Sequence, residues 1–267
     1  MRSTVRRRLR LATAIGLAGV LVAAVLLVVS HLRGTRRATC TASVPNERYE
    51  LTPSRAANAT TIAAAGVRLG MPDHAVTVAL AAALQESRLD NLPGGDRDSV
   101  GLFQQRPSQG WGRAAQLSDP SYAATAFYRA LARVPGWAEM PVTDAAQRVQ
   151  RSATPAAYAR WETEARVLAR VLTGEVAAGF ACRFVTVPTT TSADEAANAA
   201  VAALGSPGTN VPVSTGRGWT IASWLVGHAP TYGIVDVTFA GWEWSATRGT
   251  WERAGATSPR VEFRVNA

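Results

Sequence analysis

The chain has 267 residues, of which 47% are apolar and 18% are charged, a balance that excludes a disordered protein. Its three histidines lie far apart, and its two cysteines lack metal-ligand spacing, so no zinc or iron–sulfur site is expected. Glycine-rich phosphate loops and the Gly-x-Ser-x-Gly elbow are also absent from the sequence. We therefore expect no metal, no cofactor and no α/β-hydrolase chemistry.

All 28 basic residues are arginine, and eight of them precede residue 38, in a stretch without acidic residues. The other 20 arginines face 19 acidic residues, so the rest of the chain has a net charge of +1. A nucleic-acid-binding protein keeps its basic surplus in the folded part. The charge distribution therefore argues against nucleic acid as a partner.

The N-terminal region contains an uncharged apolar run of 20 residues, 11–30. As a helix this run would be about 30 Å long, which matches the hydrocarbon core of a lipid bilayer. Five arginines precede it, so the positive-inside rule places the N-terminus in the cytoplasm and the bulk of the chain outside. Residues 1–37 are thus predicted to be a cytoplasmic tail and a single-pass anchor in the cell membrane. A cleaved signal peptide is the alternative.

Both cysteines, Cys40 and Cys182, fall on the exported side of that anchor, where disulfides persist. An even count favours one disulfide, which would close a loop of about 140 residues and stabilise the fold by about 5 kcal/mol. Two unrelated buried thiols are the alternative.

The residues between the cysteines are predicted to form a mostly helical domain, 38–185. Asp73 is a candidate N-cap, and Asp119-Pro120 and Thr154-Pro155 each combine an N-cap residue with a first-turn proline. The segment after residue 88 is rich in Asp, Asn, Gly and Pro, which is typical of a loop. The expected helices are residues 58–69, 74–86, 120–133 and 155–173.

One acidic residue lies where a carboxylate is disfavoured. Thr77 is the only polar residue in 75–84, so this helix is expected to be buried on all sides. Glu86 stands at its C-terminal end, where the helix dipole and apolar neighbours both raise the pKa of a carboxyl group. A carboxyl group protonated near neutral pH can donate a proton to a glycosidic oxygen. A solvated glutamate in the last turn is the alternative.

Glu86-Ser87, a polar loop, and then Gly101 to Gln104 (GLFQ) and Pro107 resemble the signature of the soluble lytic transglycosylases, relatives of goose-type lysozymes. The separation of 18 positions from Glu86 to Gln104 fits the usual spacing of that family. The resemblance covers residues 55–172 and is strong over 84–107. It implies a lysozyme-like domain that acts on peptidoglycan glycan strands, with Glu86 as the single acid and base.

The mechanism implied by the resemblance uses one carboxyl group twice. Glu86 would protonate the oxygen between N-acetylmuramic acid and N-acetylglucosamine, and then take the proton of the muramyl 6-hydroxyl, which yields a 1,6-anhydro product. A hydrolytic lysozyme would use a second acid, for which Asp96 and Asp98 are candidates. Asp and Asn also serve turns in polar loops, which is the other interpretation of these two residues.

Five further residues are candidates for substrate binding, each with a structural alternative. By the resemblance, Gln104 would hold a sugar amide or hydroxyl, or else bond to backbone in its turn. Gly101 suits a close backbone approach, and Ser99 lies in the same loop. Trp111 could stack on a sugar or fill the core, and Tyr158 could donate its hydroxyl or simply pack.

The sequence departs from the family pattern in two places. Residues 147–150 (QRVQ) replace the family's YNAG segment, and Ala123 stands where the family has asparagine. These departures leave open a domain that binds glycan without cutting it.

The C-terminal region is predicted to be a linker, 186–193, followed by a small α+β domain, 194–267. Helical periodicity over 194–204 and 219–229 and alternation over 234–239 and 261–265 predict two helices on a small antiparallel sheet. Five of the eight tryptophans fall here, where they would fill a small core or bind sugar or a protein partner.

The sequence therefore predicts an α+β protein. The leading hypothesis is a membrane-anchored cell-wall lytic enzyme, a transglycosylase or muramidase. The alternatives are an inactive peptidoglycan-binding or envelope-assembly protein, and an adaptor whose C-terminal domain recruits an envelope protein.

Overall fold

A computed structural model describes residues 37–152, 154–189, 192–255 and 257–266, together with Val22, Ala24, Val25 and Leu27. The chain divides into two units, Met1–Arg37 and Ala38–Ala267. No helix among the described residues is long and apolar enough to cross a bilayer. The predicted span, residues 11–30, lies outside the described residues except at those four positions, which are helical.

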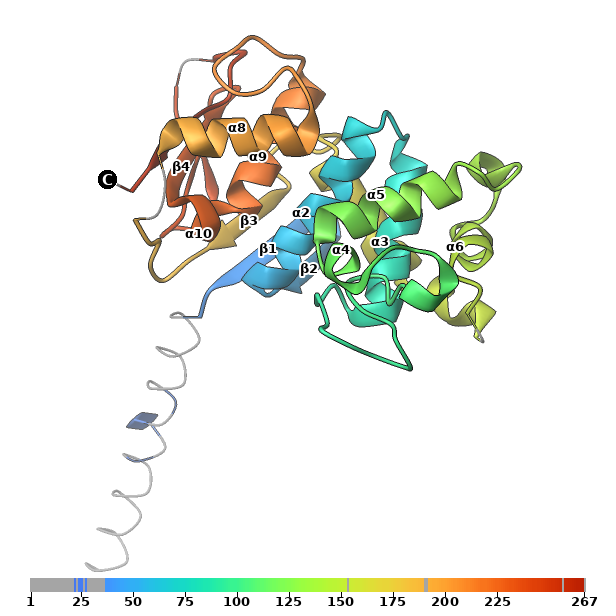
Figure 1. The fold of residues 1–267 in the computed structure, drawn as a ribbon. Helices are drawn as coiled ribbons and strands as arrows, with labels where there is room; N and C mark the ends of the chain where they lie inside the picture. Colours follow the sequence, from blue (N-terminus) through green and yellow to red (C-terminus); the bar gives the residue numbers. More distant parts are fainter. Residues whose placement is uncertain are drawn as a thin grey trace, which may run out of the picture. The chain divides into compact units, whose positions relative to one another are not determined.

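The second unit has the predicted α+β character (Figure 1). Two small antiparallel sheets accompany nine α-helices in the described part of the chain. The α-helices are α2 (Pro53–Arg68), α3 (Asp73–Ser87), α4 (Ala114–Leu117), α5 (Pro120–Leu131), α6 (Val142–Gln150), α7 (Glu162–Leu172), α8 (Ala193–Leu204), α9 (Thr215–Gly227) and α10 (Ala229–Tyr232). The 3-10 helices are η1 (Pro107–Gln109), η2 (Trp137–Glu139) and η3 (Pro155–Trp161).

The first sheet was not predicted. It has the strand order β2-β1-β3, formed by β1 (Thr39–Val44), β2 (Glu47–Leu51) and β3 (Phe180–Arg183). Cys40 and Cys182 lie directly opposite each other on β1 and β3 and form the predicted disulfide. Both cysteines are fully buried, so the disulfide joins the strands before and after the helical region inside the core.

The second sheet confirms the two-helix, antiparallel-sheet prediction for the C-terminal region. Its strand order is β6-β5-β4-β7, and α8 and α9 accompany it. Its strands are β4 (Ile234–Phe239), β5 (Trp242–Ser245), β6 (Trp251–Arg253) and β7 (Glu262–Val265). Figure 1 shows these elements on one side of α2 and the first sheet, with α3 to α6 on the other side.

Several helix ends differ from the prediction. Asp119 caps α5 as expected, because its carboxylate accepts the backbone N–H groups of Ser121 and Tyr122. Asp73 does not cap α3 but is its first helical residue, after Pro72. The helix expected after Thr154 starts as the 3-10 helix η3 and becomes α-helical only at α7, and α9 ends at Gly227 rather than at residue 229.

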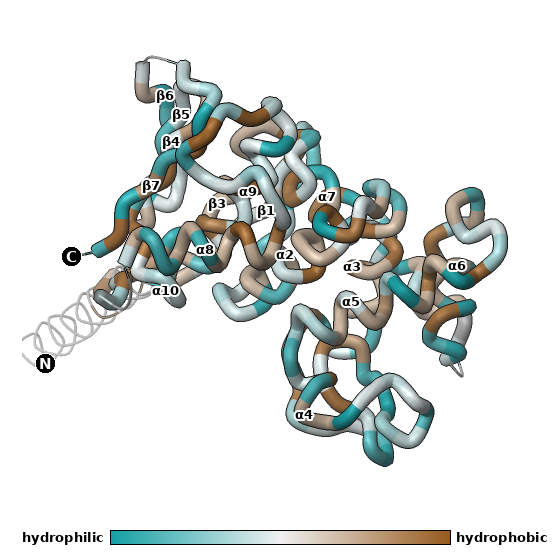
Figure 2. Tube along the Cα trace, turned by 45° about the horizontal axis from the view of Figure 1, so that its top comes forward, coloured by the Kyte–Doolittle hydropathy of each residue, from teal (hydrophilic) through white to brown (hydrophobic). Residues whose placement is uncertain are grey.

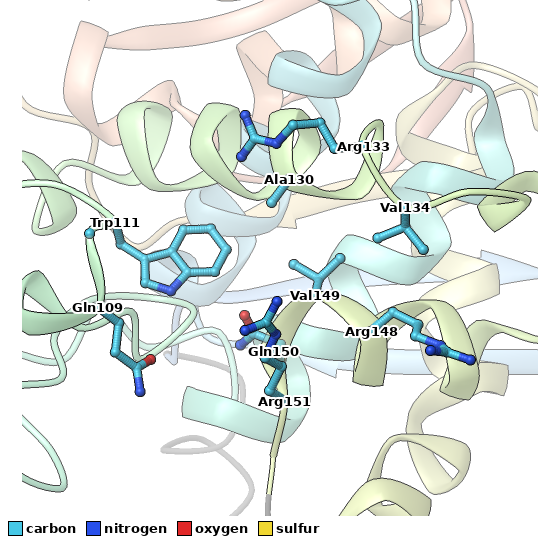
Figure 3. A pocket seen from close by; sticks show the side chains of 10 residues that line it. Gln109, Trp111, Ala130, Arg133, Val134, Arg148, Val149, Gln150 and Arg151 are labelled. Atoms are coloured by element: carbon cyan, nitrogen blue, oxygen red, sulfur yellow. The ribbon is translucent and has the colours of Figure 1, made fainter.

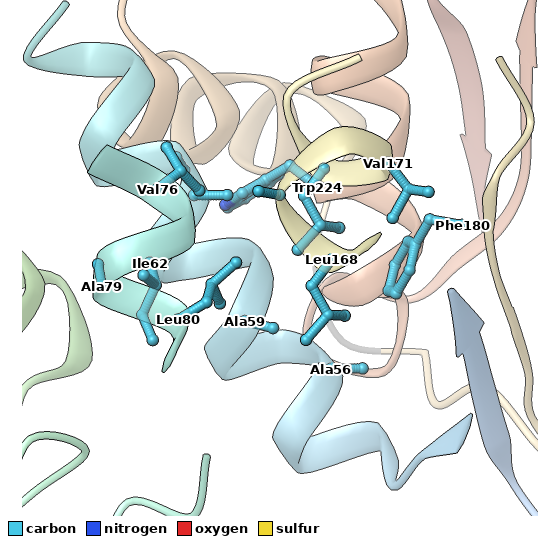
Figure 4. Packing of buried hydrophobic residues seen from close by; sticks show 14 of the residues in the cluster. Ala56, Ala59, Ile62, Val76, Ala79, Leu80, Leu168, Val171, Phe180 and Trp224 are labelled. Carbon is cyan, nitrogen blue, oxygen red and sulfur yellow. The ribbon is translucent and has the colours of Figure 1, made fainter. Parts of the chain in front are cut away.

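The core is centred on α3, which packs against α2, α5, α6 and α7. All residues from 75 to 84 are buried, as their composition predicts. Figure 4 shows Ile62 and Leu80 meeting Leu168, with Phe180 and Trp224 close by, so one apolar cluster joins helices from both halves of the unit. In Figure 2 the hydrophilic segments gather in the outer loops, such as those around α4.

Tryptophans connect the two sheets. The indole N–H of Trp244 donates to the carbonyl of Cys182 at 2.9 Å, and that of Trp251 donates to the carbonyl of Phe180 at 2.7 Å. Trp219, Trp224 and Trp244 are buried. These three therefore fill the core, while Trp242 and Trp251 are partly exposed.

Candidate active site around Glu86

Glu86 lies in the last turn of α3, at the point where this buried helix reaches the surface. The helix stops at Arg88, which adopts the left-handed conformation, and the backbone N–H of Leu89 returns to the carbonyl of Ala83. Leu89 is fully buried, so the chain after the helix is held firmly. The sequence thus fixes the stem of Glu86 in the core and leaves its carboxyl group at the helix end.

The Glu86 carboxyl group is only partly exposed, unlike a solvated glutamate. Burial raises the pKa of Glu86 above its usual value, because a charge loses hydration there. Hydrogen bonds from Tyr158 and Gln150 stabilise the charged form and hold the pKa down, but burial is the larger effect. The group is therefore poised to exchange a proton closer to neutral pH than an ordinary glutamate.

Tyr158 is fully buried in η3, and its hydroxyl donates to Glu86 Oε1 at 2.7 Å. Burial and the neighbouring carboxylate both raise the pKa of Tyr158, so its hydroxyl stays protonated. Tyr158 therefore fixes the orientation of the carboxyl group from inside the fold. In the structure the Tyr158 hydroxyl is engaged with Glu86 and placed to orient its carboxyl group.

The Gly101 to Gln104 turn lies against the end of α3. The Ser87 hydroxyl, itself buried, donates to the carbonyl of Leu102 at 2.7 Å. The Gln150 amide donates to the carbonyl of Phe103 at 2.8 Å, and it also helps to hold down the pKa of Glu86. The two halves of the family-like motif are therefore neighbours in space, and Gln150 bridges them from α6.

Gln104 is occupied within its own loop. Its amide oxygen accepts from the Ser99 hydroxyl at 3.1 Å, and its amide nitrogen donates to the carbonyl of Gly101 at 3.0 Å. Ser99 also donates to the carbonyl of Asp96. Ser99 and Gln104 thus brace the loop beside Glu86, which matches the turn alternative considered for Gln104.

Gly101 has a φ of +78°, and a Cβ atom there would lie 2.3 Å from the carbonyl oxygen of Leu117. Only glycine fits this close approach. Its role is to let the loop pack against α4.

Asp98 and Asp96 do not adjoin the Glu86 carboxyl group through any described contact. Asp98 accepts from the Arg106 guanidinium at 2.8 Å and from the backbone and hydroxyl of Ser108. These bonds lower the pKa of Asp98 well below its usual value, so it is a permanent anion that anchors the loop. Asp96 is exposed beside Arg97.

Gln85 and Trp161 form a further group of contacts near Glu86, which was not predicted from the sequence. Gln85 Oε1 accepts from the Trp161 indole at 2.9 Å and from Arg160 at 3.0 Å. The Arg88 guanidinium lies 4.1 Å from the centre of the Trp161 ring. No sequence signal connects α3 with η3, because the residues are more than 70 positions apart.

Trp111 lines a cavity of about 620 Å³ that adjoins this site. Its wall runs from residues 109–111 to the end of α5 and to residues 148–151, so it includes Gln150, the partner of Glu86. Figure 3 shows the Trp111 indole and Gln109 facing Val149 across the hollow, with Gln150 and Arg151 below. We call this hollow the Trp111 groove. Trp111 is partly exposed in it, which suits contact with a sugar ring.

Among the described residues, no group of three or more His, Cys, Asp or Glu side chains is placed to hold a metal ion. A scan against protein-family models and a search of curated proteins found no match to the chain.

Tyr158→Phe is expected to raise the pKa of Glu86 further, because the carboxylate loses a hydrogen bond while burial persists. A carbon-13 NMR titration of the Glu86 carboxyl group measures the shift. Tyr128→Phe is the matched control, since its buried hydroxyl donates to the carbonyl of Ile62 at 3.0 Å, away from Glu86. Each variant should lose about 1 kcal/mol of stability. An unchanged or lowered Glu86 pKa in Tyr158→Phe would contradict the positioning role.

Proposed function

We propose that this protein is a membrane-anchored cell-wall lytic enzyme that cleaves the bond between N-acetylmuramic acid and N-acetylglucosamine in peptidoglycan. One observation carries the proposal: the Glu86 carboxyl group is partly buried and held by Tyr158, and the neighbouring Gln150 contacts the GLFQ turn and lines the Trp111 groove. A lysozyme-like fold for the helical region is part of the proposal. Its support is the sequence signature together with the packing of Ser87 on Leu102.

The proposed reaction is that of a lytic transglycosylase with a single acid and base. Protonated Glu86 donates to the glycosidic oxygen as the C1–O bond of the muramyl sugar breaks, and the leaving sugar departs with a free hydroxyl. The Glu86 carboxylate then accepts the proton of the muramyl 6-hydroxyl, whose oxygen bonds to C1. The product is a 1,6-anhydro ring, and Glu86 regains its proton.

A lyase is preferred to a hydrolase because Asp98 is committed to Arg106 and Ser108. A hydrolase of the inverting type would use a second carboxylate as a base for water. A permanently charged, loop-bound Asp98 with several donors is poorly suited to accept a proton.

The proposed location is the cell membrane, with a cytoplasmic N-terminus and the remainder outside the cytoplasm. The apolar run 11–30 supports an anchor, and the apolar side chains of Val22, Val25 and Leu27 are 57%, 53% and 70% exposed. The Cys40–Cys182 disulfide supports folding in an oxidising compartment. An envelope protein partner for residues 194–267 is proposed as well, with the partly exposed Trp242 and its stacked Arg253 as a surface.

A catalytically inactive peptidoglycan-binding or envelope-assembly role is the second candidate. The observation that favours it is the engagement of the Gln104 amide inside its loop, where its oxygen accepts from Ser99 and its nitrogen donates to the carbonyl of Gly101.

Digestion of purified peptidoglycan by the full chain, followed by mass spectrometry, tests the proposal. We expect soluble fragments that end in 1,6-anhydromuramic acid. Fragments with hydrated reducing ends would replace the lyase by a hydrolase. Binding to peptidoglycan without any released fragment would favour the second candidate.

A further inference from the structure

The Trp111 groove carries positive charge, which the binding of a neutral glycan would not require. Arg133, Arg148 and Arg151 all contribute to its wall, from the end of α5 and the end of α6. Among the described residues none of these three guanidinium groups lies within 4.0 Å of a carboxylate. A smaller hollow of about 190 Å³ shares Trp111 and Arg133 and adds Arg129.

No described residue that lines either hollow is acidic. The positive charge is therefore concentrated around one aromatic ring, although the chain beyond residue 37 is nearly neutral overall. Most other arginines named in the helical region have partners: Arg55 pairs with Asp90, Arg106 with Asp98, and Arg166 with Glu162. The three groove arginines are exposed and unpaired with any described carboxylate, so their guanidinium groups are available to an anionic group of a ligand.

The geometry separates two of the arginines from the third. Figure 3 shows Arg133 reaching over the hollow towards Trp111 and Arg151 lying below it beside Gln150, while the guanidinium of Arg148 points away from Trp111. Arg151 also keeps a left-handed backbone, with a φ of 52°, at the end of α6. Arg133 and Arg151 are thus the pair that can grip one ligand lying against the indole.

We infer that the Trp111 groove binds a carboxylate of the acidic peptide that hangs from a muramyl sugar, with Arg133 and Arg151 as its ligands and Trp111 under the sugar or peptide. This inference rests on the proposed function. The groove adjoins Glu86 through Gln150, so a strand held at Glu86 would carry its peptide into the groove. Arginine suits this task because its planar guanidinium matches a carboxylate with two hydrogen bonds.

The test compares two ligands in a chain that binds without cutting, the full-length Glu86→Gln variant. The ligands are a purified disaccharide-tetrapeptide and the same disaccharide freed of its peptide by an amidase, with the lactyl carboxylate that this exposes capped as a methylamide. Isothermal titration calorimetry measures both affinities. We expect the peptide-bearing ligand to bind at least tenfold more tightly. Added salt should weaken that advantage, because exposed charges are screened.

Arg133→Ala together with Arg151→Gly should reduce the affinity for the peptide-bearing ligand about tenfold and leave the peptide-free ligand unchanged. Glycine is chosen at 151 because it adopts the left-handed backbone there without the cost that any residue with a Cβ atom, arginine included, carries. Arg48→Ala on β2, in the first sheet, removes an exposed arginine elsewhere and should change neither affinity. Arg148→Ala is the control from the same groove, and its effect should be smaller than that of the pair.

An equal loss for both ligands, or no loss for either, would overturn the inference while leaving the proposed function intact. Arginine-dependent binding of a purified phosphate-bearing wall polymer, with no preference for the peptide, would also overturn it. Failure of the Glu86→Gln chain to bind either sugar ligand, with no digestion by the parent chain, would instead refute the proposed function.

Discussion

Glu86→Gln is expected to abolish the release of fragments from peptidoglycan, with a loss of at least about 10³-fold in rate. The amide has the shape of the carboxyl group and can still accept the Tyr158 hydroxyl bond, so the fold should be unchanged. It can neither donate a proton to the glycosidic oxygen nor accept one from the 6-hydroxyl. Both steps of the proposed reaction would therefore fail.

Glu164→Gln is the matched control for that variant. Glu164 is also partly buried, on α7, and burial likewise raises the pKa of Glu164, while Arg88 and Arg55 oppose the rise. It has no described contact with the GLFQ turn or the Trp111 groove. Fragment release by Glu164→Gln should stay close to that of the parent chain. Release of anhydro fragments by Glu86→Gln at the normal rate would remove Glu86 from the chemistry.

Replacing both Cys40 and Cys182 by alanine is expected to lower the free energy of unfolding by about 5 kcal/mol. The disulfide closes a chain segment with a sequence separation of 142 residues, and its loss frees that whole segment in the unfolded state. Urea titration followed by tryptophan fluorescence measures the loss as an earlier midpoint, with a steeper slope because the unfolded chain without the cross-link is less compact. A decrease of this size is comparable to the total stability of many domains, so part of the chain would unfold at moderate temperature.

Reducing agent supplies the internal control for the cysteine variant. It should destabilise the parent chain towards the level of the double variant and leave the double variant unaffected. A double variant as stable as the oxidised parent would show that hydrogen bonding between β1 and β3 alone holds this sheet together.

The sequence predicted those elements whose signals are local. Asp119 and Pro120 lie side by side in the chain and start α5, and strict alternation over 234–239 matches β4. The first sheet was not predicted, because β1 pairs with β3 across the entire helical region. The alternating burial of β1 and the left-handed Asn46 in the turn after it were the only local signs of a hairpin.

The same contrast between local and long-range signals applies to the candidate site. Glu86 and the GLFQ turn could be recognised because their spacing is short and their residue types are restricted. Gln150 and the groove arginines could not, because α6 and the end of α5 bring them together in one groove only after the helices have packed. The roles of Ser99 and Gln104 depend on the direction in which their side chains point. Hydrogen bonds within the loop decide that direction, and no periodicity of the sequence encodes them.

The position of the disulfide has a mechanical consequence. Cys40 is only three residues beyond the end of the first unit, in the central strand of its sheet. A pulling force transmitted through residues 1–37 would therefore reach a covalent cross-link before it reached the helices that carry Glu86. Under the proposed function, tension between the membrane anchor and a bound glycan strand would load β1 and β3 together, and the cross-link would oppose the detachment of β1 from the sheet.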